Sequence, residues 1–307
     1  MHHRPSRLPA LFSSALLSLS FTASGQETTL EIAGSKIDVV FDAPVADSLR
    51  EMVLERIKLS SKAIVNYYRR YPVPEVRIDV SPHFGRGVSG GRASGWNGAR
   101  IRLGVGKEST PADFAADWVT THEMVHLAFP TQEDQHHWIE EGQAVYIEPI
   151  ARARIGELTP EQVWGDMVRD MPKGQPAKGD QGLDSTHTWG RTYWGGAIFC
   201  LLADVQIRER THNQKGLEDA LRAVLTEGNI EAEWPLERAI ATGDKATGVP
   251  VLHELYEQMK ATPVTVDLDA LWKKLGVKTV NGQVVFDDNA PLAGVRRAIT
   301  EAVRGER

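Results

Sequence analysis

The sequence predicts an α+β protein, with an amino-terminal α/β lobe that holds a small sheet and a mainly helical carboxy-terminal lobe. Short segments that alternate apolar and polar residues occur mostly before residue 105, whereas apolar residues at helical spacing dominate from residue 111 onward. The chain is 41% hydrophobic and can bury a substantial core. We expect residues 26–130 and 131–307 to be two lobes of one domain.

Residues 1–25 have the features of a secretory signal peptide. Two arginines precede a short apolar stretch over residues 8–21, and the small residues Ala23 and Gly25 lie three and one positions before Gln26. The stretch is too short and too rich in serine for a permanent anchor. We therefore expect cleavage near Gly25-Gln26, a periplasmic or secreted protein, and no stable membrane anchor.

Composition limits both the partners and the thiol chemistry of the chain. Without residues 1–25 it keeps 33 Lys+Arg against 41 Asp+Glu, because that segment contains two arginines and no acid. A negative chain lacks the basic face that binds phosphates, which argues against nucleic acid as a partner. The single Cys200 lies in the apolar run Ala197–Leu202, so we expect a buried, unreactive side chain.

Four strands and one long helix are expected in the first lobe. The strands are segments of alternating pattern: Thr28–Ile32, Lys36–Phe41, Val76–Val80 and Arg100–Leu103. The helix runs from about Val45 to Arg70 and is ended by Pro72. Between the last two strands, residues 85–98 are rich in glycine and predict a loop.

The second lobe and the helix leading into it are expected to be almost wholly helical. Thr110 is a candidate N-cap with Pro111 at the first helical position, and this helix should run unbroken to Pro130. Further helices are expected to start near Trp138 and Pro160, to span Arg191–Arg210, Leu217–Leu225 and Asp267–Leu275, and to start again at Pro291. A polar loop over residues 173–188 precedes the longest of them, and Asn281-Gly282 predicts a hairpin turn.

The segment His122-Glu123-Met124-Val125-His126 carries the strongest chemical signal. Residues four apart lie on one face of a helix, one turn from each other, so both imidazoles can reach one zinc ion. Glu123 then lies beside the metal, where it can accept a proton from water. The alternative is a half-buried helix whose histidines make only local hydrogen bonds.

A third ligand is expected from the helix that begins near Trp138. Glu140 and Glu141 are adjacent and point about 100° apart on a helix, so only one can face the histidines. Glu141 shares its stripe with Trp138, Ala144 and Val145, which favours it over Glu140. Two histidines and one carboxylate leave one zinc position open, which is typical of a catalytic site.

These motifs resemble those of the gluzincin branch of zinc peptidases, which is thermolysin-like in fold and includes the M1-type aminopeptidases. In that group His-Glu-x-x-His is followed by a helix reading Glu-Gly-x-Ala, with another glutamate seven residues after the first. Glu141-Gly142-Gln143-Ala144 and Glu148 match, although the 14 residues between His126 and Glu141 are fewer than is usual. The resemblance implies one catalytic Zn²⁺, Glu141 as a ligand and Glu148 as a support behind the ligands.

A second similarity lies downstream, at Tyr193-Trp194-Gly195-Gly196-Ala197. It is similar to the tyrosine segment of these aminopeptidases, in which the hydroxyl donates to the oxyanion of the tetrahedral intermediate, although Gly195 stands where lysine is usual. The resemblance implies this role for Tyr193. His187 is a competing donor, and a tyrosine merely packed at a helix start is the other alternative. The adjacent histidines His136 and His137 are expected to face solvent in a loop.

The sequence thus predicts an exported zinc metallopeptidase with Glu123 as general base and a peptide or protein substrate. M1-type aminopeptidases hold the free amine of the substrate with a glutamate in a Gly-x-Met-Glu-Asn segment, but residues 89–105 contain no acid. We therefore expect an endopeptidase, unless an acid such as Glu140 or Glu148 binds the amine. Two further alternatives are a hydrolase of another cell-envelope amide or ester and a binding protein on an inactive peptidase fold. The oligomeric state is not predicted.

Overall fold

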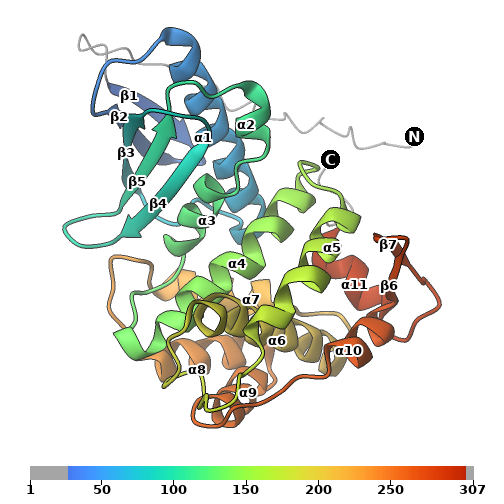
Figure 1. Cartoon of the computed structure of the whole chain (residues 1–307). Coiled ribbons are helices and arrows are strands. Elements are labelled where there is room, and N and C mark those ends of the chain that lie inside the picture. Colours follow the sequence, from blue (N-terminus) through green and yellow to red (C-terminus); the bar gives the residue numbers. More distant parts are fainter. Residues whose placement is uncertain (1–26, 302–307) are drawn as a thin grey trace, which may run out of the picture.

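The computed structural model describes residues 27–301, and in it a sheet lobe lies above a larger helical lobe (Figure 1). The expected signal peptide lies outside these residues. The sheet has the strand order β1-β2-β3-β5-β4. Its strands are β1 (Glu27–Ile32), β2 (Ser35–Phe41), β3 (Glu75–His83), β4 (Val88–Ser94) and β5 (Arg100–Gly106). β2, β3 and β5 are parallel to one another, while β1 and β4 run antiparallel at the two edges.

Helix α1 (Asp47–Tyr68) connects β2 to β3 and covers one face of the sheet (Figure 1). Parallel neighbours need such a crossover. Leu49, Val53 and Ile57 are buried along the helix, and every second residue of the central strands is buried beneath them. The opposite face of the sheet carries polar residues, so the core of this lobe lies only on the α1 side.

The prediction of a glycine-rich loop over residues 85–98 was wrong, because Val88–Ser94 forms the edge strand β4. Its pairing with β5 shifts register between Val88 and Gly90. Glycine is disfavoured in strands, so local propensity gave no sign of β4. β4 is stabilised instead by its pairing with β5, a strand in which apolar and polar residues alternate.

The remaining elements confirm a mainly helical second lobe. The helices are α2 (Pro111–Ala115), α3 (Val119–His126), α4 (His137–Arg154), α5 (Pro160–Asp170), α6 (Gly196–Arg210), α7 (Leu217–Glu227), α8 (Leu236–Thr247), α9 (Val251–Met259), α10 (Leu268–Leu275) and α11 (Ala293–Thr300). The expected hairpin is formed by β6 (Val277–Val280) and β7 (Gln283–Phe286), with Asn281 and Gly282 at positive φ. The sequence had given no expectation for α8 and α9.

Two long helices predicted as continuous are interrupted. Thr110 and Pro111 do begin a helix, but α2 ends at Ala115, and α3 starts separately where Asp117 Oδ1 accepts the backbone N–H of Val119 at 2.8 Å. The expected helix Arg191–Arg210 begins instead as a π-helical turn over Gly190–Gly195, which continues into α6. π-Helical turns are uncommon and often occur at functional sites.

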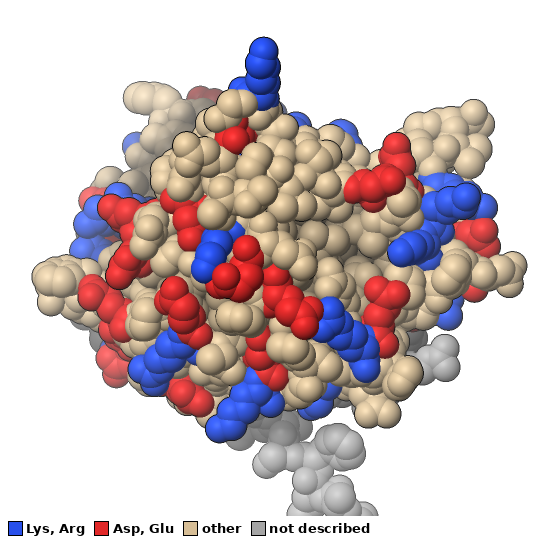
Figure 2. Space-filling view, turned by 90° about the horizontal axis from the view of Figure 1, so that it is seen from below, with Lys and Arg blue, Asp and Glu red and all other residues tan. Residues whose placement is uncertain are grey.

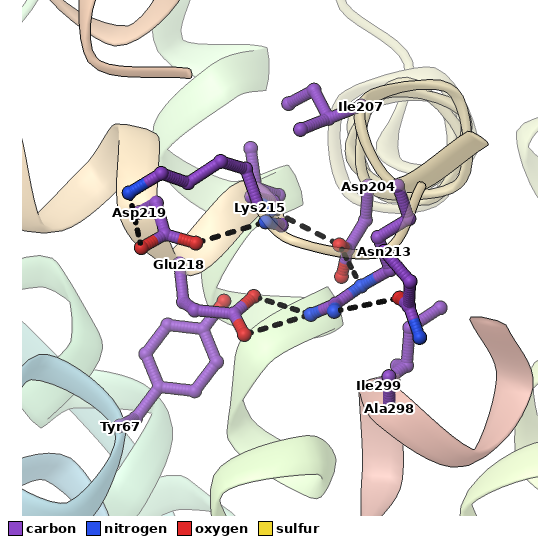
Figure 3. Close-up of polar contacts among 12 residues, drawn as sticks. Tyr67, Asp204, Ile207, Asn213, Lys215, Glu218, Asp219, Ala298 and Ile299 are labelled. Atoms are coloured by element: carbon purple, nitrogen blue, oxygen red, sulfur yellow. Dashed lines mark hydrogen bonds and ion pairs between the residues drawn. The ribbon is translucent and has the colours of Figure 1, made fainter. Parts of the chain in front are cut away.

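A buried ionic cluster holds α4, α6 and α7 together in the helical lobe. Arg208 donates to both carboxylate oxygens of Glu218 at 2.7 Å and to Asp204 at 2.8 Å (Figure 3). Arg154 of α4 reaches Glu218 at 3.2 Å. Burial alone raises the pKa of Glu218, but the two guanidinium groups outweigh it and lower that pKa to about 2.

The face of the helical lobe seen from below carries charges of both signs (Figure 2). Acidic and basic side chains are interspersed on the face of the helical lobe seen from below, and no broad basic area appears among the described residues drawn there (Figure 2). Cys200 is buried as expected, and burial raises the pKa of its thiol. None of the helices in residues 27–301 is long and apolar enough to cross a membrane.

Candidate active site

His122, His126 and Glu141 come together at the junction of the two lobes. One ligand atom of each lies within 4.8 Å of the others. The Nε2 atoms of His122 and His126 lie 3.2 and 3.8 Å from the same Glu141 oxygen, Oε2. Two imidazole nitrogens and a carboxylate oxygen at this spacing are the donor set of a catalytic zinc site, so the residues present fit the metal.

The protonation of these groups also suits a cation. Burial, together with the neighbouring His122, lowers the pKa of His126 to about 3, so its imidazole is neutral at pH 7. Burial alone would raise the pKa of Glu141, but hydrogen bonds to His122 and His137 hold it well below its usual range. Neutral imidazole and ionised carboxylate are the forms that bind metal.

A buried arginine of α1 holds helix α3 in place. Arg56 Nη2 donates to Thr121 Oγ1 at 2.8 Å, and its Nε lies 3.3 Å from Asp117, which accepts the backbone N–H of the first residue of α3. Thr121 in turn donates to Ser60 at 2.9 Å. These side chains are all buried, so the helix that carries both histidines has a fixed position against the sheet lobe.

Glu141, and not Glu140, belongs to the metal group, as the helical-phase argument predicted. Glu140 lies outside that group, with one carboxylate oxygen 3.2 Å from His137 Nδ1 and the other 3.3 Å from the backbone N–H of Gln132. His137 Nε2 lies 3.3 Å from Glu141 Oε1. The hydrogen bond to Glu140 and then that to Glu141 raise the pKa of His137 to about 10, so it adds positive charge at the rim of the site.

Glu123 is pressed against the edge strand β4. A Cβ atom at Gly91 would lie 2.4 Å from Glu123 Cγ, so only glycine leaves room for this side chain. The backbone amide of Ala93 donates a hydrogen bond to its carboxylate, while burial raises the pKa of Glu123 to about 7. The carboxylate is therefore held between the histidine helix and β4, where a general base would have to be.

Tyr193 lines the same cleft as the two histidines. Its ring is nearly parallel to that of His122, with centroids 6.5 Å apart, and burial followed by the charge of Glu141 raises its pKa to about 12. Two glycines allow α4 and α6 to approach each other closely, because a Cβ at Gly142 would lie 2.4 Å from the Cα of Gly196. The close contact of α4 and α6 at these glycines brings the π-helical turn to the metal group.

The other two predicted residues lie farther from the centre. His187 is exposed and is not among the residues that line the cleft. Glu148 is buried in α4, accepts a hydrogen bond from Arg152 at 2.7 Å, and its pKa is raised to about 7 by burial. His122 is among the charges that act on Glu148, which places this carboxyl behind the metal group.

The prediction that His136 faces solvent was wrong. Its side chain is buried, and its Nε2 lies 3.1 Å from the hydroxyl of Tyr256. That hydroxyl donates to Asp184 at 2.9 Å, and Asp184 also accepts from Trp138 Nε1 at 2.8 Å. This cluster attaches the start of α4 to α9, which no local pattern in the sequence could indicate.

The metal group lies in a cleft of about 1330 Å³ between the lobes. One wall is β4 with the residues after it, including the 80% exposed Trp96. Trp118, whose ring meets His122 edge-on at 5.3 Å, forms another part. The helical lobe adds acids that the sequence analysis missed, Glu231 and Glu233, which a backbone bridge between Thr131 and Glu233 brings to the cleft.

Comparison with known proteins identifies the fold. No protein-family model and no curated protein sequence matches this chain. Among solved structures, it is similar to an aminopeptidase N family protein from Idiomarina loihiensis, with a TM-score of 0.60 and 14% identity over 85% of this chain and 49% of the other.

Two M1 zinc metallopeptidase structures show the same likeness. One, a two-domain M1 zinc metallopeptidase variant bound to L-arginine, has a TM-score of 0.50 and 13% identity over 82% of this chain and 54% of the other. The other, from Deinococcus radiodurans, has a TM-score of 0.50 and 12% identity over 82% and 52%. The chain thus spans about half the length of the structures it matches. It has the fold of the M1 zinc metallopeptidase catalytic domain, and its His-His-Glu group is consistent with the zinc site of a gluzincin.

Proposed function

We propose that this protein is an exported zinc-dependent metallopeptidase that cleaves peptide bonds within a chain. The observation that carries the proposal is the convergence of His122, His126 and Glu141, with Glu123 held beside them in an open cleft. An inactive binding protein on this fold would have no need of a buried carboxylate at that position. Export is inferred from the features of residues 1–25.

Metal binding, proton transfer and stabilisation of the oxyanion are assigned to different residues of the site. His122, His126 and Glu141 would hold zinc, which when bound acidifies water and polarises a carbonyl as a Lewis acid. Glu123 accepts the proton of the attacking water and returns it to the leaving amine. Tyr193 donates a hydrogen bond from its hydroxyl to the oxyanion.

Two features favour cleavage within a chain. The part of the cleft wall formed by residues 88–97 has no acid and carries Arg92, so a protonated amine placed there meets like charge. β4 is an edge strand along the cleft, and its backbone can pair with an extended peptide. Glu140 and Glu231 also line the cleft, and Glu231 accepts a hydrogen bond from the backbone N–H of Ala99 at 3.2 Å, so an amine-binding role would fall to these two acids.

The test is cleavage of an unbiased peptide library by the protein depleted of metal and then reloaded with zinc. We expect internal cleavage that appears only after zinc is restored. The best substrate should then be compared with and without amino-terminal acetylation. Faster cleavage of the free-amine form, with release of single amino-terminal residues, would replace the endopeptidase proposal with an aminopeptidase.

A further inference from the structure

A second groove, of about 610 Å³, lies on the outer face of the sheet. It shares five residues with the cleft, all near the end of β4 and the turn after it or on the facing loop: Arg92, Ser94, Trp96, Asn97 and Glu231. The two hollows therefore adjoin at the end of β4, so a path from the metal group to the outer face of the sheet would lead around that end.

Two arginines lie side by side in the second groove. Arg92 of β4 and Arg102 of β5 are direct antiparallel partners, so both side chains leave the sheet on the same face. Within residues 27–301, neither makes a side-chain hydrogen bond or ion pair. Like charges opposite each other on neighbouring strands destabilise a sheet, so this pair needs a compensating anion.

The other arginines of the groove already have a carboxylate. Arg77 and Arg100 both bind Asp79, with Arg77 Nε 2.8 Å from Asp79 Oδ1. Arg77 and Arg102 are both exposed on this face. Arg92 and Arg102 are therefore the two arginines of the groove without a carboxylate partner, in a groove that Asp38, Glu75 and Glu231 also line.

We propose that Arg92 and Arg102 bind an acidic segment of the peptide substrate at a distance from the scissile bond. The proposal rests on the proposed peptidase function and adds a substrate class to it. Guanidinium groups bind carboxylates through two parallel hydrogen bonds, and two of them on adjacent strands suit successive or alternate acidic side chains. The path around the end of β4 is the route by which a substrate engaged at the metal group reaches them.

Binding is tested on the full mature chain without metal, so that the result does not depend on hydrolysis. The probe is a labelled, acetylated and amidated peptide of six glutamates, with a six-glutamine peptide as reference, measured by fluorescence anisotropy at low salt. We expect the glutamate peptide to bind more tightly, and Arg92→Gln or Arg102→Gln to weaken it about two- to tenfold each. Arg102→Lys keeps the positive charge but loses the paired N–H donors of the guanidinium group, so it should bind the glutamate peptide less tightly than wild-type protein does.

Arg77→Gln is the matched control, because it removes the same charge from the same face while Asp79 keeps Arg100. It should leave binding unchanged, and thermal unfolding of each variant should show that the fold is retained. The second arm compares one cleavable peptide carrying four glutamates or four glutamines at either end. A lower KM at unchanged kcat for a glutamate extension, lost in Arg102→Gln, supports the proposal.

Equal binding of the two six-residue peptides, or an equal loss in Arg77→Gln, would overturn it. If glutamate-specific binding is found while no library peptide is cleaved, the peptidase function fails and the anion site stands. If peptides are cleaved without any preference for acidic extensions, the peptidase function stands and the acidic-substrate proposal fails.

Discussion

Replacement of Gly91 by alanine adds one methyl group, which should lower the catalytic rate while metal binding is kept. The new Cβ would lie 2.4 Å from Glu123 Cγ, 2.7 Å from its Oε1 and 2.8 Å from its Cδ, whereas ordinary contact begins at 3.4 Å. The glutamate must therefore retreat by about 1 Å, a displacement that can lower a rate on the order of 10²-fold when the group takes part in the chemistry. Glu123 is only 7% exposed, so it has little free space into which to move.

The assay is kcat on the best library peptide together with zinc per chain. We expect kcat to fall about 10²-fold in Gly91→Ala while zinc content stays at one per chain. Gly90→Ala is the matched control, because it adds the same methyl group to the same strand with nothing within 4 Å. Unchanged kcat in Gly91→Ala, or an equal loss in both variants, would refute the placement of Glu123 against β4.

Three further outcomes follow from the described contacts. Glu141→Ala should lose zinc and Glu140→Ala should keep it, as measured by metal analysis after dialysis, and the reverse result would contradict the ligand assignment. Tyr193→Phe should keep zinc and KM while kcat falls about 10²–10³-fold. The lowered pKa of Glu218 implies that its stabilising contribution is complete above its ordinary pKa of 4.5 and is lost as the pH falls toward about 2. Urea unfolding across this range should show the loss, and Glu218→Gln, which removes the carboxylate shared by Arg154 and Arg208, should unfold more easily at pH 7 by about 3–5 kcal/mol.

The metal group was predictable because its geometry is mostly local. His122 and His126 are one helical turn apart, and helical phase alone separates Glu141 from Glu140. The same local reasoning placed the capping residue Thr110 at the helix start observed.

The rest of the site depends on contacts between distant segments. β4 has no strand propensity of its own and exists through its pairing with β5, so the fit of Gly91 to Glu123 could not be derived from sequence. His136 is buried in a contact with Tyr256, which lies 120 positions further along the chain. Glu231 reaches the cleft through a loop whose path is set by a bridge to the segment after α3.

The central claim is that a zinc-loaded chain hydrolyses peptide bonds with Glu123 as its base. The most direct measurement is single-turnover cleavage of one peptide by wild-type protein and by Glu123→Gln, both adjusted to the same zinc occupancy. Glutamine keeps the size of the side chain but cannot accept the proton, so we expect the variant to bind zinc and peptide normally and to lose nearly all cleavage. Cleavage by Glu123→Gln at the wild-type rate, or no cleavage of any peptide by zinc-loaded wild-type protein, would contradict the account.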